Sequence, residues 1–254
     1  MSLVTPIAAF TYAHYRHILQ SALDSDYTFI SFSDLNDLQL EEQPVCLLRH
    51  DCDNDLTAAV AIARMEEEMG VRSTYFLMLR SALYNLLSIP SAEMVREIIA
   101  RGHWIGLHFD EHYYPDASPV QLAACVDRER SWLCDEFGVP VEVVSFHQPS
   151  WRILDKQVKI GCVNTYDLSQ LHDVYYLSDS NTVWKEGCPS EFFRARRHRR
   201  LQLLLHPEWW TAEQLTIQEK WNRMLSNNFA LIQQSLLTRE RVYVHEQAIE
   251  FRAS

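Results

Sequence analysis

The chain has 254 residues and a formal net charge of −11 at pH 7, with 47% hydrophobic and 22% charged residues. These proportions exclude a disordered or fibrous protein and are those of a globular chain. The acidic balance disfavours nucleic acid as a partner, because a polyanion would be repelled. The sequence contains no apolar run of about 18 residues, so it predicts no integral membrane segment. At this length an α/β fold can form one domain, which we expect over 1–254.

The cysteines and the N-terminus bear on the cellular compartment of the protein. Six cysteines are scattered, without a CxxC pair or the close spacing of a disulfide scaffold, which predicts free thiols in a reducing environment. The first twenty residues lack the basic start, apolar stretch and cleavage site of a signal peptide. We therefore expect a cytoplasmic protein. One basic segment, 194–200 (RARRHRR), departs from the acidic balance and is either a solvated charged face or a patch that attracts phosphate.

Strand and helix patterns alternate along most of the chain. Apolar runs typical of buried strands occur at 45–51, 73–79, 103–108, 141–147, 161–167, 174–180 and 201–207. Helical spacing of apolar residues occurs at 56–70, 91–102, 118–138 and about 211–237. Ser91 and Ser118 are the expected N-caps, and Gly70 and Gly102 the expected stops. Repeated βα units predict a parallel sheet with helices outside it, either a closed barrel or an open doubly wound sheet.

Titratable residues follow several of the predicted strands directly. The segments VCLLRHDCD, HWIGLHFDEH, VEVVSFHQP, VYYLSD and LQLLLHP each pass from apolar residues into His or Asp. The carboxyl ends of parallel strands gather at one face of an α/β fold, where sites are built. A single polar residue after a strand is usually a turn former or a helix cap, but five such strand ends indicate a functional site.

The first cluster is formed by three aspartates in 49–55. Residues two apart in an extended segment share a side, so Asp51 and Asp53 should project together while Cys52 points away. Two carboxylates this close repel each other unless a cation lies there or one of them stays protonated. Alternatively, Asp53 or Asp55 caps the following helix. If Asp55 is the cap, Asp51 and Asp53 can still face a cation, so the two interpretations are compatible.

The second cluster contains two histidines four residues apart. His108 and His112 have the spacing that presents two imidazoles together on a helical turn or a tight loop. Alone, this spacing is weak evidence for a metal site. Together with the aspartate pair, it predicts a divalent metal site of two histidines and one carboxylate. Such a site leaves coordination positions for water and substrate.

Both clusters resemble motifs of the NodB-like polysaccharide deacetylases, carbohydrate esterase family four. The segment 102–112 (GHWIGLHFDEH) resembles the family's second motif, H-[ST]-x-x-H preceded by GHEIGN. The segment 49–55 (RHDCDND) resembles its first motif, typically TFDDG, in the variant with one residue between the aspartates. The resemblance implies a single-domain, distorted (β/α) barrel of seven strands. Its motif-bearing core would be about 45–210, followed by a C-terminal helical segment of about 211–240.

The resemblance also implies roles for the residues of both clusters. Asp51 would be the general base, and Asp53, His108 and His112 would be the ligands of one divalent metal ion. Mixed nitrogen and oxygen ligation suits Zn²⁺ best, although Co²⁺, Ni²⁺, Mn²⁺ or Fe²⁺ can occupy such a site.

The family's third motif, an R-P-P-Y-like turn, is represented by 146–151 (FHQPSW), where a histidine replaces the arginine. The resemblance implies that His147 supports the base and that the backbone N–H of Ser150 binds the oxyanion.

The two last motifs concern an acid and the residue that holds it. His206, at the end of an apolar strand, would be the general acid. Asp179, shortly before Trp184, would orient it, with Asp167 as the rival.

Five aromatic residues near the motifs could form a platform for a sugar, or could be ordinary core residues: Tyr84, Tyr113, Trp151, Trp209 and Trp210.

The HDxD, GLHxD and LLxHPEWW segments resemble a branch of the family associated with surface-polysaccharide biosynthesis, of the O-antigen or capsule type. The resemblance implies a metal-dependent hydrolase that removes an N-acetyl group from a nucleotide-linked or lipid-linked sugar. Two alternatives remain open. The protein could hydrolyse another amide or a cyclic amide, or it could be a degenerate sugar-binding or interaction module, as the histidine at position 147 and the altered aspartate motif suggest. The oligomeric state is not predicted.

Overall fold

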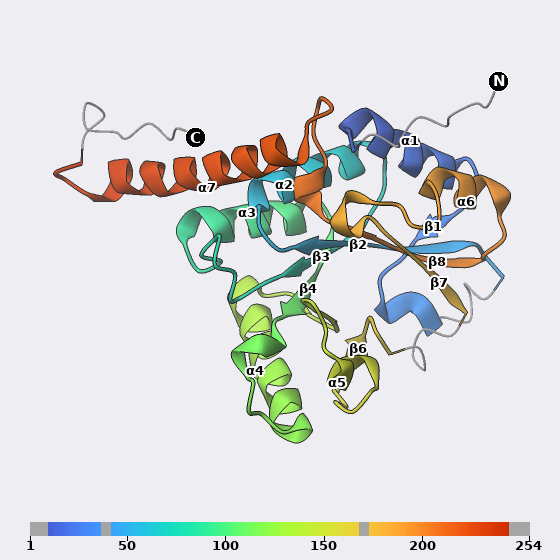
Figure 1. Ribbon diagram of the computed structural model, residues 1–254, viewed down its shortest axis with the longest axis horizontal. Coiled ribbons are helices and arrows are strands. Elements are labelled where there is room, and N and C mark those ends of the chain that lie inside the picture. Colours follow the sequence, from blue (N-terminus) through green and yellow to red (C-terminus); the bar gives the residue numbers. More distant parts are fainter. Residues whose placement is uncertain (1–9, 37–41, 168–172, 244–254) are drawn as a thin grey trace.

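The computed structural model describes residues 10–36, 42–167 and 173–243. Its centre is a parallel sheet in the order β6-β5-β4-β3-β2-β8-β7 (Figure 1). The strands are β2 (Val45–Cys52), β3 (Thr74–Leu77), β4 (Trp104–Phe109), β5 (Val143–Phe146), β6 (Val163–Asn164), β7 (Val174–Ser178) and β8 (Arg200–Leu205). A two-residue strand, β1 (Thr28–Phe29), pairs with the first residues of β2. The sheet curls into a half-barrel, and its end strands β6 and β7 are not paired with each other in the described ranges. The predicted seven-stranded, distorted barrel is confirmed.

Helices surround the sheet on the outside. They are α1 (Tyr12–Leu23), α2 (Leu56–Glu68), α3 (Ile89–Ala100), α4 (Pro119–Phe137), α5 (Trp151–Leu154), α6 (Pro189–Ala195) and α7 (Ile217–Arg239). Short 3₁₀ turns are η1 (Ser33–Asn36), η3 (Glu111–Tyr113), η4 (Ser180–Thr182) and η5 (Pro207–Trp209). Figure 1 shows α1 and α6 at the end of the sheet that carries β7 and β8, and α7 extending past the sheet beyond α2 and α3. None of the described helices combines the length and apolar character needed to cross a bilayer.

Strand β2 explains how the barrel interior becomes polar. Val45 and Leu47 belong to an interior cluster with Phe32 and Leu35, whereas the alternate residues of β2 pack toward the helices. Side chains two apart on a strand share a face, so Arg49 and Asp51 continue the interior series. Apolar residues therefore fill one end of the interior, and charged residues occupy the end where the strands terminate.

Several predicted caps and stops are confirmed. Asp55 caps α2 by accepting the Ala58 N–H at 3.1 Å, and Gly70 ends this segment with a φ of 70°. Ser118 forms a capping box with Gln121 at the start of α4. All six cysteines are free.

Three predicted boundaries are corrected. Helix α3 begins at Ile89 and is capped by Ser88, because Ser91 lies in the first turn and donates its N–H to Ser88. Helix α7 begins at Ile217, where Thr216 forms a capping box, and not near 211. The strand expected at 161–167 is only Val163–Asn164.

A buried carboxylate between β2 and α2 organises the helix-facing side of the sheet. Glu66 accepts hydrogen bonds from the hydroxyls of Tyr75 at 2.7 Å, Ser73 at 2.6 Å and Tyr15, and lies 2.7 Å from His50 Nε2. Burial opposes ionisation of this group, but His50 and the other donors outweigh it and lower its pKa to about 2. His50, which had no predicted role, is therefore part of a structural network.

We expect Glu66→Gln to lower the free energy of unfolding by about 2 kcal/mol at pH 7, since a charged acceptor is lost from a buried network. The pKa is lowered in the folded state, so the stabilisation by Glu66 is complete above its ordinary pKa near 4.5 and is lost as the pH falls toward 2. Urea denaturation at pH 7 and at acidic pH should show the difference from wild type shrinking on acidification. Glu68→Gln, at an exposed position of the same helix, is the matched control. Equal effects of the two changes would contradict the expectation.

Candidate active site

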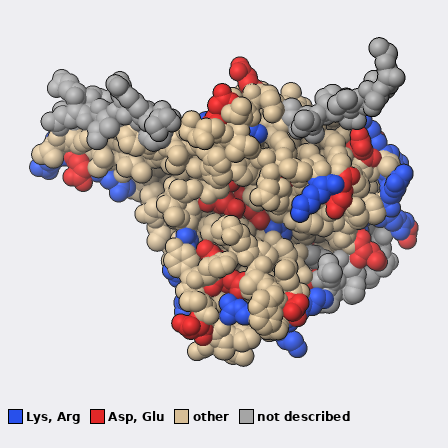
Figure 2. Space-filling view, viewed as in Figure 1, with Lys and Arg blue, Asp and Glu red and all other residues tan. Residues whose placement is uncertain are grey.

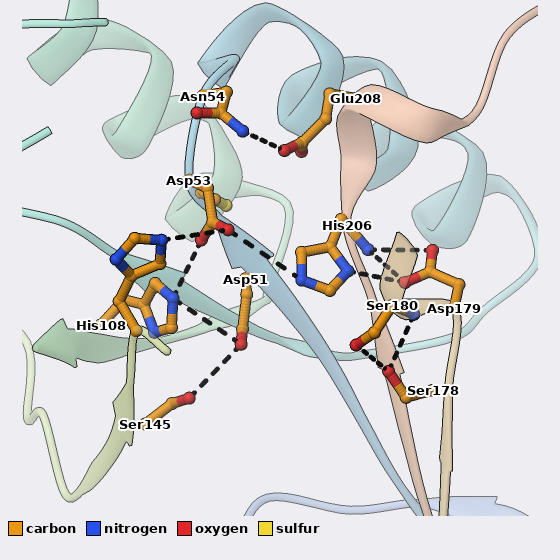
Figure 3. Close-up of polar contacts among 12 residues, drawn as sticks. Asp51, Asp53, Asn54, His108, Ser145, Ser178, Asp179, Ser180, His206 and Glu208 are labelled. Carbon is orange, nitrogen blue, oxygen red and sulfur yellow. Dashed lines mark hydrogen bonds and ion pairs between the residues drawn. The ribbon is translucent and has the colours of Figure 1, made fainter. Parts of the chain in front are cut away.

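Polar side chains from four strand ends converge at the open end of the half-barrel. Asp51 and Asp53 come from the end of β2, His108 from β4, His147 from the residue after β5, and His206 from the residue after β8. Figure 3 shows Asp51, Asp53, His108 and His206 pointing toward one another, and Figure 2 shows acidic atoms recessed at the centre of this face. The predicted gathering of these strand ends is thus observed.

Asp53 lies among three imidazoles. Its Oδ1 is 2.9 Å from His108 Nε2, and its Oδ2 is 3.9 Å from His147 Nε2 and 4.0 Å from His206 Nε2. Burial opposes ionisation of Asp53, but His108 and the two other histidines outweigh it and lower its pKa to about 2. This carboxylate is therefore ionised at neutral pH.

Asp51 is almost fully buried, yet one of its oxygens has no partner. Oδ2 accepts a hydrogen bond from Arg49 Nη2 at 2.7 Å and one from Ser145 Oγ at 3.4 Å, whereas no residue that the structure describes forms a hydrogen bond with Oδ1. Burial opposes ionisation, but the Arg49 guanidinium, with His108 and His206, lowers the pKa of Asp51 below its ordinary value. Asp51 therefore presents an anionic oxygen inside the site.

Arg49 was not identified from the sequence as a site residue. Its side chain is fully buried, and Nη2 also donates to Ser145 Oγ at 2.7 Å. The guanidinium lies 5.2 Å from the centre of the Phe76 ring. The sequence assigned the support of Asp51 to His147, whereas in the structure the guanidinium that contacts Asp51 is that of Arg49. The two-residue spacing between Arg49 and Asp51, already used for Asp51 and Asp53, is the signal that could have found it.

His206 is held from behind by Asp179. Nδ1 of His206 lies 2.6 Å from Asp179 Oδ1, and the Trp210 indole donates to Asp179 Oδ2 at 3.0 Å. Burial disfavours the charged imidazole and lowers the pKa of His206. The negative charge of Asp179, together with those of Asp53 and Glu208, outweighs burial and raises this pKa to about 10. The structure thus brings Asp179 to His206, whereas the rival Asp167 pairs with Lys156.

His112 is not brought to the cluster. Its side chain is 60% exposed, and its Nδ1 lies 2.9 Å from Asp110 Oδ1. No ion pair joins it to Asp53 or Asp51 within the described part of the chain. As the described side chains lie, no group of three or more His, Cys, Asp or Glu residues is arranged to hold a metal ion. The expected ligand set of Asp53, His108 and His112 therefore does not fit a metal in this structure.

The backbone N–H of Ser150 is already engaged. It donates to Glu111 Oε1 at 2.6 Å, and the Ser150 hydroxyl donates to Glu111 Oε2 at 3.0 Å. Glu111 is buried and also pairs with Arg152 at 3.0 Å. The predicted oxyanion donor is therefore a structural contact that joins the β5 loop to η3.

The five aromatic residues separate into two groups. Trp210 is fully buried against Asp179, and the Tyr84 hydroxyl donates to the backbone of Cys52 at 2.6 Å from a buried position. Both side chains are largely enclosed by the protein. Trp151 and Tyr113 are exposed, and half-buried Trp209 packs edge-on against Trp221.

Glu208 is a further acidic residue beside the cluster that sequence reasoning missed. It is buried, its Oε1 accepts a hydrogen bond from Asn54 at 2.6 Å, and its Oε2 has no partner among the described residues. Burial first, and then the charge of Asp53, raise the pKa of Glu208 to about 8. Its position two residues after His206, in the segment HPEWW, was the available signal.

Helix α7, to which no role was assigned, braces this region. Asn228 donates to the backbone oxygen of Asn54 at 3.1 Å, and Asn227 donates to Asp55 Oδ2 at 3.0 Å. Arg223 donates to the backbone oxygens of Glu208 and Trp210. The helix thus holds the loop that carries Asp53.

Fold and site together define a curled α/β half-barrel with an acidic, histidine-rich centre at its strand ends. No protein-family model and no curated protein matches the sequence. Solved structures similar to the chain include a pseudoenzyme of carbohydrate esterase family 4 from Bacillus anthracis, at 13% identity and a TM-score of 0.45 over 75% of this chain and 62% of that one. A Streptococcus mutans esterase of the same family matches at 14% identity and a TM-score of 0.44, over 85% and 90% of the two chains. The chitin deacetylase of Colletotrichum lindemuthianum matches at 13% and 0.42, over 74% and 84%.

The chain spans less than two thirds of the length of the Bacillus anthracis pseudoenzyme. At these identities the similarities assign no activity, and the proposal that follows rests on the site.

Proposed function

We propose that the protein is a hydrolase of the NodB-like polysaccharide deacetylase family that removes an N-acetyl group from an amino sugar. The observation that carries this proposal is that one site holds a buried carboxylate bound by a guanidinium, Asp51 with Arg49, and an imidazole bound by a carboxylate, His206 with Asp179. Asp51 is an anion with a free oxygen, and the pKa of His206 is raised to about 10. Such a pair supplies a base and an acid at the same pH.

The chain's own residues then have distinct tasks. Asp51 Oδ1 accepts the proton of the water that attacks the acetyl carbonyl carbon, and Arg49 and Ser145 hold the other oxygen of that carboxylate. His206 Nε2, which faces the cleft, donates a proton to the departing amine, while Asp179 fixes Nδ1. The products are acetate and a free amino sugar. Exposed Trp151 and Tyr113 are proposed to contact the sugar.

The proposed substrate is a soluble N-acetylated precursor of a surface polysaccharide, linked to a nucleotide or a lipid, in the cytoplasm. The basic segment 194–200 is not part of this site, because it ends at the first residue of β8, whereas His206 follows the last residue of that strand. The degenerate-module alternative loses part of its support, since Arg49 supplies the guanidinium that position 147 lacks.

Acetate release from purified protein tests the proposal. UDP-N-acetylglucosamine and N-acetylglucosamine oligomers, each in buffer supplied with Zn²⁺ or Co²⁺, are the substrates. We expect acetate and one free amine per turnover from at least one of them. Hydrolysis of a cyclic amide without action on any N-acetyl sugar would contradict the proposed deacetylation and favour the alternative of a cyclic-amide hydrolase.

We expect Asp179→Asn to move the alkaline limb of the kcat/KM profile to lower pH by at least about one unit. The reason is that the Asp179 carboxylate is the group that chiefly raises the pKa of His206, which must be protonated to act as the acid. A pH series of initial rates from 6 to 11 measures the limb. Asp167→Asn, which removes the carboxylate that pairs with Lys156, is the control and should leave the alkaline limb in place. An unchanged limb in Asp179→Asn would show that His206 is not the acid.

A further inference from the structure

A basic hollow lies beside the first residues of β7 and β8. It has a volume of about 780 Å³. Its lining includes Asp173, Tyr175, Arg197, His198, Arg199 and Arg200. Arg200 is the first residue of β8, whereas His206 follows the last one, and a strand of six residues spans roughly 20 Å. The hollow is therefore separate from the candidate active site.

We propose that this hollow binds an anion that carries a diphosphate group. The anion is either free pyrophosphate or a nucleoside diphosphate, which share the group that arginine recognises. This inference goes beyond the proposed deacetylation and gives a task to the basic segment 194–200, which lies outside the candidate active site.

The positive charge of the hollow is only partly balanced by the protein itself. Three arginines of the segment 194–200 already have partners: Arg194 donates to His17 Nε2 at 2.6 Å, Arg196 pairs with Asp26 at 2.6 Å, and Arg199 pairs with Glu42. Arg197 and Arg200 form no ion pair with any residue that the structure describes. Two guanidinium groups therefore remain for a ligand, in a chain whose formal net charge is −11.

These two arginines come from different elements. Arg200 is fixed by the sheet, where it pairs with Val45 of β2 and Val174 of β7. Arg197 is exposed and lies in the link between α6 and β8. A guanidinium binds a phosphate through two parallel N–H groups, so two guanidiniums match two linked phosphates. Asp173 is the one acidic residue among the described lining residues, and its charge opposes the binding of an anion.

Two residues of the lining also form an aromatic layer. The rings of Tyr175 and His198 lie 3.8 Å apart at 14° to each other, and the Phe192 ring lies 5.5 Å from that of Tyr175 at 24°. A nucleobase can stack on such a layer, because every base has a π face. The layer would distinguish a nucleoside diphosphate from free pyrophosphate, which has no ring.

Isothermal titration calorimetry with inorganic pyrophosphate tests the site. We expect wild type to bind it, and Arg197→Ala and Arg200→Gln each to weaken binding by about tenfold or more, the factor for one lost charged hydrogen bond. Asp173→Asn should strengthen binding by up to about fivefold, because it removes a like charge. Arg96→Ala, at an exposed position of α3, is the matched control and should leave the affinity unchanged. Arg197 is exposed as well, so its replacement should not disturb the fold.

Titrations with UDP and with uridine distinguish the two sources of the diphosphate. Tighter binding of UDP than of pyrophosphate, with the advantage lost in Tyr175→Leu, identifies a nucleoside diphosphate. Equal affinities identify pyrophosphate. Binding of uridine as tight as that of UDP would overturn the inference, because the diphosphate would then contribute nothing.

Three further results would overturn it. The first is that wild type binds neither pyrophosphate nor UDP. The second is that Arg96→Ala weakens pyrophosphate binding as much as Arg197→Ala and Arg200→Gln do, since the attraction would then be a property of the whole surface. The third is that His206→Gln abolishes pyrophosphate binding, since the anion would then lie in the candidate active site.

Discussion

Asp51→Asn is expected to lower kcat by about 10²- to 10⁴-fold with a small change in KM, which is the range for loss of a positioned general base. Asn keeps the shape of the side chain and still accepts a hydrogen bond from Arg49, but its amide cannot take a proton from water. We propose Oδ1 as the base because no residue that the structure describes donates to it and because the lowered pKa of Asp51 keeps the carboxylate ionised. Initial rates of acetate release, measured at saturating and at limiting substrate, separate kcat from KM.

The matched control for this change is Asp116→Asn, the same replacement at an exposed position on the loop after η3. It should leave the rate as in wild type. Denaturant unfolding of both variants shows whether a lower rate reflects chemistry or folding. A rate within threefold of wild type in a folded Asp51→Asn protein would remove Asp51 from the mechanism.

Arg49→Met is expected to lower the free energy of unfolding by about 3–5 kcal/mol, the usual cost of leaving one partner of a buried ion pair alone. The two side chains of this pair are 0% and 3% exposed, and the guanidinium also bonds Ser145. Without Arg49, the largest of the influences that lower the pKa of Asp51 is lost, so this pKa rises. Urea denaturation at pH 7 measures the loss of stability.

A double variant separates the ion pair from simple packing. Arg49→Met combined with Asp51→Asn removes both charges, so it should be more stable than Arg49→Met alone. The pKa of Asp51 is lowered in the folded state, so its contribution is present above its ordinary pKa and is lost as the pH falls. The single variant should therefore approach wild-type stability in acid. Additive losses in the double variant would mean that Arg49 contributes through packing and not through its charge.

Arg49 also changes how the third motif is interpreted. His147 in place of an arginine was one of the reasons to consider a degenerate protein. In the folded chain an arginine beside Asp51, the proposed base, comes from the same strand, two residues before it.

Much of the fold could be predicted because its signals are local. Apolar runs defined the strands, and Asp55 and Ser118 capped helices as expected, because a cap depends on a few neighbouring residues. Errors occurred where two local signals compete within a few residues. Ser88 and Ser91 are both possible caps, and Pro90 at the helix start favours the earlier one.

For the site, the sequence by itself determined that Asp51, His108 and His206 lie at the same end of the sheet. The alternation of side chains along β2 places Asp51 inside and Cys52 outside, and the strand-end pattern predicts that His108 and His206 share that face. Only the tertiary structure decided which of them meet. Strand β3 lies between β2 and β4, so the contact between Asp53 and His108 depends on the curvature of the sheet. The outward turn of His112 depends on Glu111 binding a loop some forty residues later in the chain. Spacing in the sequence reports neither the curvature nor such a contact, because both arise from packing between elements that are distant along the chain.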